Sequence, residues 1–155
     1  MDDKQYLKLA LEEARKSVDQ GGFPAGAVVV QDGNVISRGV SLGFLLSDPT
    51  GHAETVAMRE ACKILKTTNL KGATLYESLQ ACVMCFSVAN WAGISRIVSA
   101  SRKTNDMISK GYYEGTTDVS QVNKQNNRQI ELVHIPELEE ESLKIVKEWE
   151  ERSRP

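Results

Sequence analysis

GHAETVAM, at residues 51–58, and QACVMCFS, at residues 80–87, are the most informative stretches of this chain for its fold and chemistry. Each begins where a helix is expected to start and carries side chains that can bind a metal. Cys82 and Cys85 are three residues apart, so they lie on one face of a helix. At a helix's first turn the backbone N–H groups and the helix dipole favour thiolate over thiol. The pair therefore suits a metal, although two small cysteines could equally pack in the core.

The first stretch adds His52 and Glu54. Within a regular helix these side chains would point to nearly opposite sides. They converge only if His52 stands at the very start of the helix, which the preceding loop (48–51) makes possible. A lone H-x-E pair is more often a surface pair. Together, however, His52, Cys82 and Cys85 supply three protein ligands and leave a fourth tetrahedral position for water, as in catalytic zinc sites, with Glu54 beside that water.

The hydrophobic periodicity around these motifs alternates between that of helices and that of strands. The predicted elements are a helix over 7–18, a hairpin over 25–40, a loop over 41–51, helices over 52–65 and 82–92, strands over 73–78, 96–100 and 129–135, and a helix over 138–149. The polar connection between the last two strands shows little obvious structure. This order predicts an α/β protein: a three-layer α/β/α sandwich around a five-stranded mixed sheet. The length favours a single domain over residues 1–155.

Composition and charge restrict the cellular setting and the partners. Lys and Arg total 19 against 21 Asp and Glu, a net charge of −2, and there is no basic stripe of the kind that binds phosphate backbones. Nucleic acid is therefore an unlikely partner on charge alone. Three cysteines argue against a disulfide framework. The polar start MDDKQYLK is not a signal peptide, and no apolar run is long enough for a bilayer, so a cytoplasmic protein without membrane contact is expected.

The combined motifs resemble the cytidine deaminase-like superfamily, whose signature is H-x-E followed by P-C-x-x-C. The likeness covers nearly the whole chain. It rests on FPAGAVVVQDG (23–33), DPTGHAETVAMREACK (48–63), TLYESLQACVMC (74–85) and WAGISRIV (91–98), in the family's order.

The resemblance implies a zinc-dependent hydrolytic deaminase. Zn²⁺ would be held by His52, Cys82 and Cys85, and it would activate a water. Glu54 would carry protons from that water to the ring nitrogen and the leaving amino group. The resemblance also implies a homodimer.

The chain departs from the family's pattern at three positions. Ala81 stands where the signature has proline, and Gln80 stands where many relatives have Glu or Ser. Ser41 replaces the asparagine that contacts the substrate ring in relatives acting on free bases, and a hydroxyl cannot offer an amide's paired donor and acceptor. The expected substrate contacts are Ser41, Phe23, Ala25, Ala53, Leu79, Gln80 and Glu114.

Three kinds of relative compete for the substrate assignment. Yeast-type cytosine deaminases rank first, because Leu79, the segment NDMISKGYY (105–113) and the closing helix look like theirs. Guanine deaminases rank second, because Glu114 falls near the place where they present an acid to the base. Deaminases of adenosine in tRNA rank third, since FPAGAV suits them but the acidic balance does not. An aromatic and an acid close the pocket of cytosine deaminases, and the candidates here are Trp149, Glu150 and Glu151.

A different class of function is a catalytically silent, zinc-stabilised binding module on the same fold. Ser41, Gln80 and Ala81 favour it, whereas Glu54 argues against it, because a structural zinc site has little use for that carboxylate. Two further residues carry structural expectations: Glu77 is expected to make a structural hydrogen bond, and Trp91 to lie in the core or a dimer interface.

Overall fold

The computed structural model describes residues 1–153, and Arg154 and Pro155, which the expected domain includes, lie outside the described residues. Within residues 1–153, five strands form one sheet in the order β2-β1-β3-β4-β5. Their bounds are β1 (Gly26–Gln31), β2 (Asn34–Val40), β3 (Thr74–Leu79), β4 (Arg96–Ser101) and β5 (Glu131–His134). β1 pairs antiparallel with β2 and β3, whereas β3, β4 and β5 are mutually parallel. The predicted mixed sheet is confirmed.

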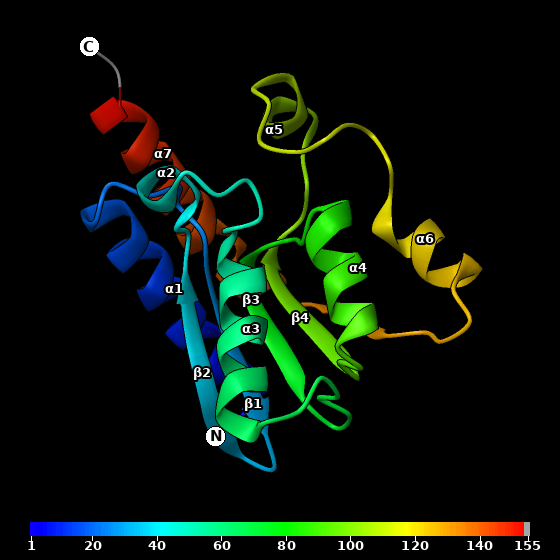
Figure 1. Ribbon diagram of the computed structural model, residues 1–155. Coiled ribbons are helices and arrows are strands. Elements are labelled where there is room, and N and C mark those ends of the chain that lie inside the picture. The colour runs from blue at the N-terminus through cyan, green and yellow to red at the C-terminus, as the bar shows by residue number, and fades with distance from the viewer. Residues whose placement is uncertain (154–155) are drawn as a thin grey trace.

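Helices cover both faces of this sheet (Figure 1). α1 (Asp3–Asp19) and α7 (Glu139–Ser153) lie on one face, and α3 (Ala53–Leu65) and α4 (Val83–Trp91) lie on the other. Because successive strand residues point to opposite faces, each strand feeds two cores. Val28, Tyr76 and Val98 pack in the core under α1 and α7, while Leu75 and Ile97 pack in the core under α3 and α4. The three-layer sandwich predicted from the element order is therefore confirmed.

The turn between β1 and β2 has the geometry that favours a two-residue hairpin. Asp32 and Gly33 have φ of 51° and 76°. Positive φ at both central residues is typical of a type I′ turn, whose twist matches that of the strands. Gly93 follows α4 with a φ of 77° and ends it, as the sequence predicts.

The segments predicted as loops contain short helices. α2 (Gly43–Leu46) lies in the loop before α3. The polar connection after β4 carries α5 (Asn105–Ser109) and α6 (Val119–Gln125), and a 3₁₀ turn, η1 (Pro136–Leu138), precedes α7. Side-chain caps start α5 and α6, since Thr104 accepts from the N–H of Met107 and Asp118 accepts from that of Ser120. Helices this short give no readable hydrophobic period.

Trp91 does not lie in the core. It is 86% exposed at the end of α4, so the core alternative for this residue is wrong. The buried residues of α4 are instead Cys85, Phe86 and Ala89, which pack in the core under α3 and α4. Among residues 1–153, no helix combines the length and the apolar character required to cross a membrane.

Candidate metal centre and its cavity

His52 stands at the N-cap of α3, outside the helical backbone, with φ −71° and ψ 154°. The loop before it closes on itself, because the N–H of Leu42 donates to the carbonyl of Gly51 at 2.8 Å. Thr55, in the first turn, donates its hydroxyl to the carbonyl of His52 at 2.9 Å. The imidazole of His52 can therefore turn toward the same side as Glu54, which is the condition for both residues to belong to one site.

Close packing of β2 against α3 fixes where this helix begins. A Cβ added to Gly39 would lie 2.2 Å from the carbonyl oxygen of Ala53 and 2.7 Å from the nitrogen of Ala57. No side chain fits there, so the strand backbone contacts the first turn of the helix directly. The glycine thereby sets the position of His52 and Glu54 relative to the sheet.

Cys82 and Cys85 open α4. Cys82 is the N-cap residue, and its sulfur accepts from the N–H of Cys85 at 3.4 Å. This places both thiols at the helix N-terminus, where partial positive charge stabilises a thiolate. The three-residue spacing brings both sulfurs to one side, as predicted.

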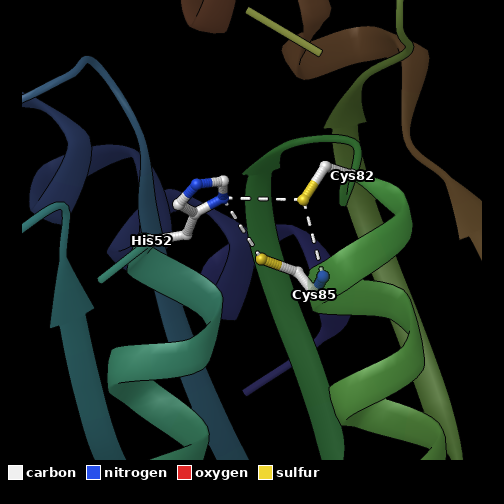
Figure 2. Close-up of side chains that lie close together, drawn as sticks. All are labelled: His52, Cys82 and Cys85. Atoms are coloured by element: carbon white, nitrogen blue, oxygen red, sulfur yellow. Dashed lines mark hydrogen bonds between the residues drawn. The ribbon is translucent and has the colours of Figure 1, made fainter. Parts of the chain in front are cut away.

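The three candidate ligands converge (Figure 2). His52 Nδ1 lies 3.5 Å from the sulfur of Cys82 and 3.5 Å from that of Cys85. All three potential ligand atoms lie within 4.8 Å of one another. His52 comes from the start of α3 and the cysteines come from the start of α4, so two helix N-termini meet at the cluster. These residues are positioned to bind a metal ion.

The electrostatics of the cluster fit a divalent cation. The hydrogen bond from Cys85, and then that with His52, lower the pKa of Cys82 to about 5. The Cys82 thiolate and burial raise the pKa of Cys85 well above its usual range. The two thiols therefore oppose each other's ionisation, and a dication between them would stabilise both as thiolates. One imidazole nitrogen and two sulfurs are a donor set that zinc prefers.

Glu54 lies beside this cluster in the first turn of α3. Its side chain is buried, and it lines the same cavity as His52 and Cys82. Burial, and then the charge of Cys82, raise the pKa of Glu54 to about 7. A carboxyl with that pKa exists in both protonation states near neutral pH, so it can accept a proton and return it.

A cavity of about 500 Å³ opens above the metal centre. Six of the seven residues predicted to contact substrate line it: Phe23, Ala25, Ser41, Ala53, Leu79 and Gln80. The seventh, Glu114, is not among the lining residues of the described chain. Its carboxylate accepts from the N–H groups of Val83 and Met84 at 3.3 and 3.1 Å, so it caps the start of α4 at the two residues that follow Cys82.

One side of the cavity is an aromatic wall formed by Phe23, Tyr112 and Trp149. Their rings meet edge-on, with centroids 5.2 to 5.6 Å apart. The carboxylate of Glu150 accepts from the Tyr112 hydroxyl at 2.7 Å and from Lys110 at 2.8 Å, which ties α7 to the 110–112 segment. Trp149 and Glu150 were loose candidates from sequence. No local sequence pattern marks the contact of Tyr112 with α7, so the sequence does not identify this residue as part of the cavity wall.

Gln80 lines the cavity but is largely engaged with its neighbours. Its side-chain carbonyl accepts from the N–H of Lys103 at 2.9 Å, and its backbone carbonyl accepts from the hydroxyl of Tyr113 at 2.6 Å. Tyr113 also lines the cavity, as does the exposed ring of Phe44 at its rim. No local sequence pattern marks Tyr113 or Phe44 as a cavity-lining residue.

The chain is similar to known deaminases, and its match to a family model covers the region that contains His52, Cys82 and Cys85. Residues 1–101 match the model of the cytidine and deoxycytidylate deaminase zinc-binding region. The tRNA-specific adenosine deaminase of Aquifex aeolicus is 38% identical over 98 residues, which span 63% of this chain and 65% of that protein. The match thus spans just under two thirds of that relative. The guanine deaminase of Bacillus subtilis is 38% identical over 106 residues, 68% of each chain.

A solved structure from a study of A-to-I editing by tRNA:A34 deaminases is similar over a longer range. It is 30% identical, covers 92% of this chain and 99% of its own, and superposes with a TM-score of 0.78. None of these three relatives is a cytosine deaminase, so they do not support a cytosine-like substrate as the first choice. The expectation that nucleic acid is an unlikely partner finds no support in them either. The chain belongs to the cytidine and deoxycytidylate deaminase zinc-binding family.

Proposed function

We propose that the chain is a zinc-dependent hydrolytic deaminase that replaces the exocyclic amino group of a nucleobase with oxygen. The observation that carries this proposal is the buried carboxyl of Glu54, which lines the same cavity as His52 and Cys82. A structural metal site would not require an ionisable carboxyl at the cavity floor. The silent binding module is therefore the weaker alternative.

The residues of the chain divide the chemistry between them. His52, Cys82 and Cys85 would hold zinc, which when bound activates water as a nucleophile near neutral pH. A carboxylate oxygen of Glu54 takes a proton from that water and delivers it to the ring nitrogen beside the amino-bearing carbon, while the water oxygen forms a bond to that carbon. Glu54 then passes the second proton to the amino group, the C–N bond breaks and ammonia leaves. One water is consumed, and the base gains a carbonyl oxygen.

For the substrate, we propose adenosine presented in a tRNA. The Aquifex aeolicus relative and the structural relative are both named for tRNA deamination. Phe44 adds a physical argument, because its ring is 68% exposed yet lines the cavity rim. An exposed aromatic beside a cavity that can admit a base can stack on a nucleotide that flanks the reacting base.

Deamination of a free base is the second candidate, and the aromatic wall favours it. Trp149 and Tyr112 enclose one side of the cavity, and Glu150 fixes them to each other. A cavity enclosed on that side suits a small planar ring without a polynucleotide attached. The similarity to a guanine deaminase also supports this alternative.

Two assays on the zinc-loaded protein distinguish the candidates. One measures inosine formation in tRNA transcripts and anticodon stem-loops that carry adenosine at the wobble position. The other measures ammonia release from adenine, guanine, cytosine and their nucleosides. We expect inosine in the RNA and little ammonia from the free bases. The opposite pattern would replace tRNA by a free base.

The Glu54→Gln variant is the control for both assays. The amide has nearly the same shape but cannot accept the proton, so turnover should fall by roughly 10²- to 10⁴-fold while zinc binding is retained. Turnover that persists in this variant would contradict the role given to Glu54. Silence of the wild-type protein on every substrate, with zinc bound, would favour the binding module.

A homodimer is the assembly that we propose, as the resemblance implies. The exposed Trp91 on α4 is an apolar side chain that a partner could cover. Light scattering tests this directly, and a monomer at micromolar concentration would contradict it.

A further inference from the structure

Glu77 is a buried carboxyl group on the strand that leads to the cysteines of the metal centre. It lies on β3 between Leu75 and Leu79, on the face of the sheet that α3 and α4 cover, and it is 1% exposed. Its strand neighbours on this face are apolar core residues. Burying a carboxyl group is costly unless hydrogen bonds compensate. The bonds that Glu77 makes therefore indicate what it does.

Both bonds converge on one oxygen of Glu77. Oε1 accepts from the backbone N–H of Ala81 at 2.9 Å and from the hydroxyl of Ser99 at 2.5 Å. Ser99 is the register partner of Glu77 on β4, so the sheet itself brings them together. The predicted structural hydrogen bond of Glu77 is confirmed. Ala81 is 3% exposed, so its N–H would be buried without a partner if Glu77 did not accept it.

The peptide that Glu77 holds leads directly into the metal centre. Ala81 precedes Cys82, whose extended backbone (φ −69°, ψ 171°) turns the chain into α4 and directs its sulfur at His52. On the other side, the N–H of Gln80 donates to the carbonyl of Ser101 at 2.7 Å. Restraints on Gln80 and Ala81 together fix the backbone from which the thiol of Cys82 projects.

The hydrogen bond to Glu77 matters because residue 81 is alanine. The zinc deaminase signature has proline before the first cysteine. Proline has no N–H and locks φ, so it neither needs an acceptor nor leaves the backbone free to rotate. Alanine adds a buried donor and a free φ. The carboxyl of Glu77 accepts the donor and restrains the peptide.

We propose that Glu77 is a positioning residue of the metal centre: by accepting the Ala81 N–H it holds the Cys82 thiol where zinc binds, in place of the signature's proline ring. The inference rests on the zinc centre of the proposed function and not on the substrate. Zinc affinity measured without substrate therefore tests it separately, and failure of deamination on every substrate would leave its outcome unaffected.

The surroundings of Glu77 Oε2 make Glu77→Gln a conservative substitution. Within residues 1–153, Oε2 has no hydrogen-bond partner. Glu77 also lines a second cavity of about 590 Å³, together with Ser99 and His134. Burial, and then the charge of Glu54, raise the pKa of Glu77 well above its usual range, so the neutral carboxyl is favoured. Glutamine matches that neutral group in shape and keeps the Oε1 acceptor, whereas leucine removes it.

The experiment compares Glu77→Gln, Glu77→Leu, Ala81→Pro and the double variant Glu77→Leu/Ala81→Pro. Zinc dissociation constants are measured by competition with a chromophoric chelator, and thermal unfolding is followed on the zinc-free proteins. Loss of a residue that orients a metal ligand costs about 10- to 100-fold in affinity. We expect that loss in Glu77→Leu, less than about threefold change in Glu77→Gln, and restored affinity in the double variant. Ser99→Ala, which removes the other bond to Oε1, should keep wild-type zinc affinity.

Two results would overturn the inference. Glu77→Leu with wild-type zinc affinity and reduced thermal stability would show a merely structural role. A double variant that binds zinc as weakly as Glu77→Leu would show that the Ala81 N–H is not what Glu77 serves. If Glu77→Leu alone does not fold, the double variant decides: wild-type zinc affinity in it supports the inference, and weak affinity or failure to fold contradicts it.

Discussion

The indole of Trp149, at the end of α7, packs edge-on against the ring of Phe23, in the loop after α1, with centroids 5.2 Å apart. This contact joins two distant parts of the chain at the side of the cavity above the metal centre. The last helix is therefore part of the candidate active site and not only a cover for the sheet.

Replacing Trp149 with alanine should weaken both the fold and the site. Aromatic pairs of this geometry contribute about 0.5–1.5 kcal/mol each beyond burial, and Trp149 makes two. We expect the loss of these two pairs alone to lower the free energy of unfolding by roughly 1–3 kcal/mol, measured with denaturant, and the KM for substrate to rise about tenfold or more. The control is Ile64→Ala, because Ile64 is an apolar side chain 57% exposed near the end of α3 and is not among the cavity-lining residues of the described chain. Equal effects of the two substitutions on KM would contradict the role of the aromatic wall.

Phe44 should matter for an RNA substrate and not for a free base. Stacking of a base on an aromatic side chain contributes about 1–3 kcal/mol. Phe44→Ala should therefore lower kcat/KM on a tRNA stem-loop by about tenfold and leave ammonia release from small substrates unchanged. Leu45, which is 52% exposed beside it but not part of the cavity lining in the described chain, provides the matched control Leu45→Ala. A loss confined to small substrates would place Phe44 against the reacting base itself.

Zinc removal should lower thermal stability through the ligand cluster. A ligand at one hundred times its dissociation constant stabilises the folded state by about 3 kcal/mol, or about 5–10 °C in a chain of this size. We expect that shift between zinc-loaded and chelator-treated protein in thermal unfolding. Cys85→Ala should abolish the shift, whereas Cys62→Ala, in the last turns of α3 away from the cluster, should retain it. A shift that survives in Cys85→Ala would place the metal elsewhere.

Gly39→Ala should disturb the start of α3. The added methyl would lie 2.2 Å from the carbonyl oxygen of Ala53, which is backbone and cannot rotate away. Overpacking of this kind costs about 1–3 kcal/mol, and a shift of the first turn should also weaken zinc binding. Gly115→Ala is the control, because a Cβ there meets no atom within 4 Å in the described structure. Denaturant titrations and zinc competition on both variants test this, and matching values for the two would contradict a close backbone contact at Gly39.

Asp3 should contribute stability that is lost in acid. The hydrogen bonds that its carboxylate accepts from Arg96, and then from Tyr76, lower the pKa of Asp3 from 3.8 to about 2. The unfolded chain therefore binds the proton first as pH falls, so the contribution is complete above about pH 4 and is lost toward pH 2. Because Asp3 is partly exposed, we expect Asp3→Asn to cost only about 1 kcal/mol at pH 7, with the difference shrinking below pH 4. Unfolding curves at several pH values measure this difference in the free energy of unfolding between the wild-type protein and Asp3→Asn. Asp19→Asn, at an exposed ion pair with Arg152, is the control, and a penalty for Asp3→Asn that grows in acid would contradict the argument.

Much of the architecture follows from local patterns. The 3.6-residue and two-residue periods locate the long helices and all five strands of the described chain, and the Asp32-Gly33 turn marks the hairpin. The ligand set is local in the same sense. His52 and Cys82 each stand at a helix N-cap, and Cys85 lies one turn after Cys82, so the spacing along the chain already directs the side chains.

Local patterns along the chain thus predict the sheet, its helical layers and a metal-binding cluster with an acid beside it. Three features arise only in the folded chain: the aromatic wall, the capping position of Glu114 and the hydrogen bond from Ala81 to Glu77. The physical reason is that each of these features joins different elements or loops of the fold, so no local pattern marks it. Periodicity reports which face of an element is buried, whereas these contacts join loops, a helix start and a strand that have no shared period and meet only when the sheet orders its strands.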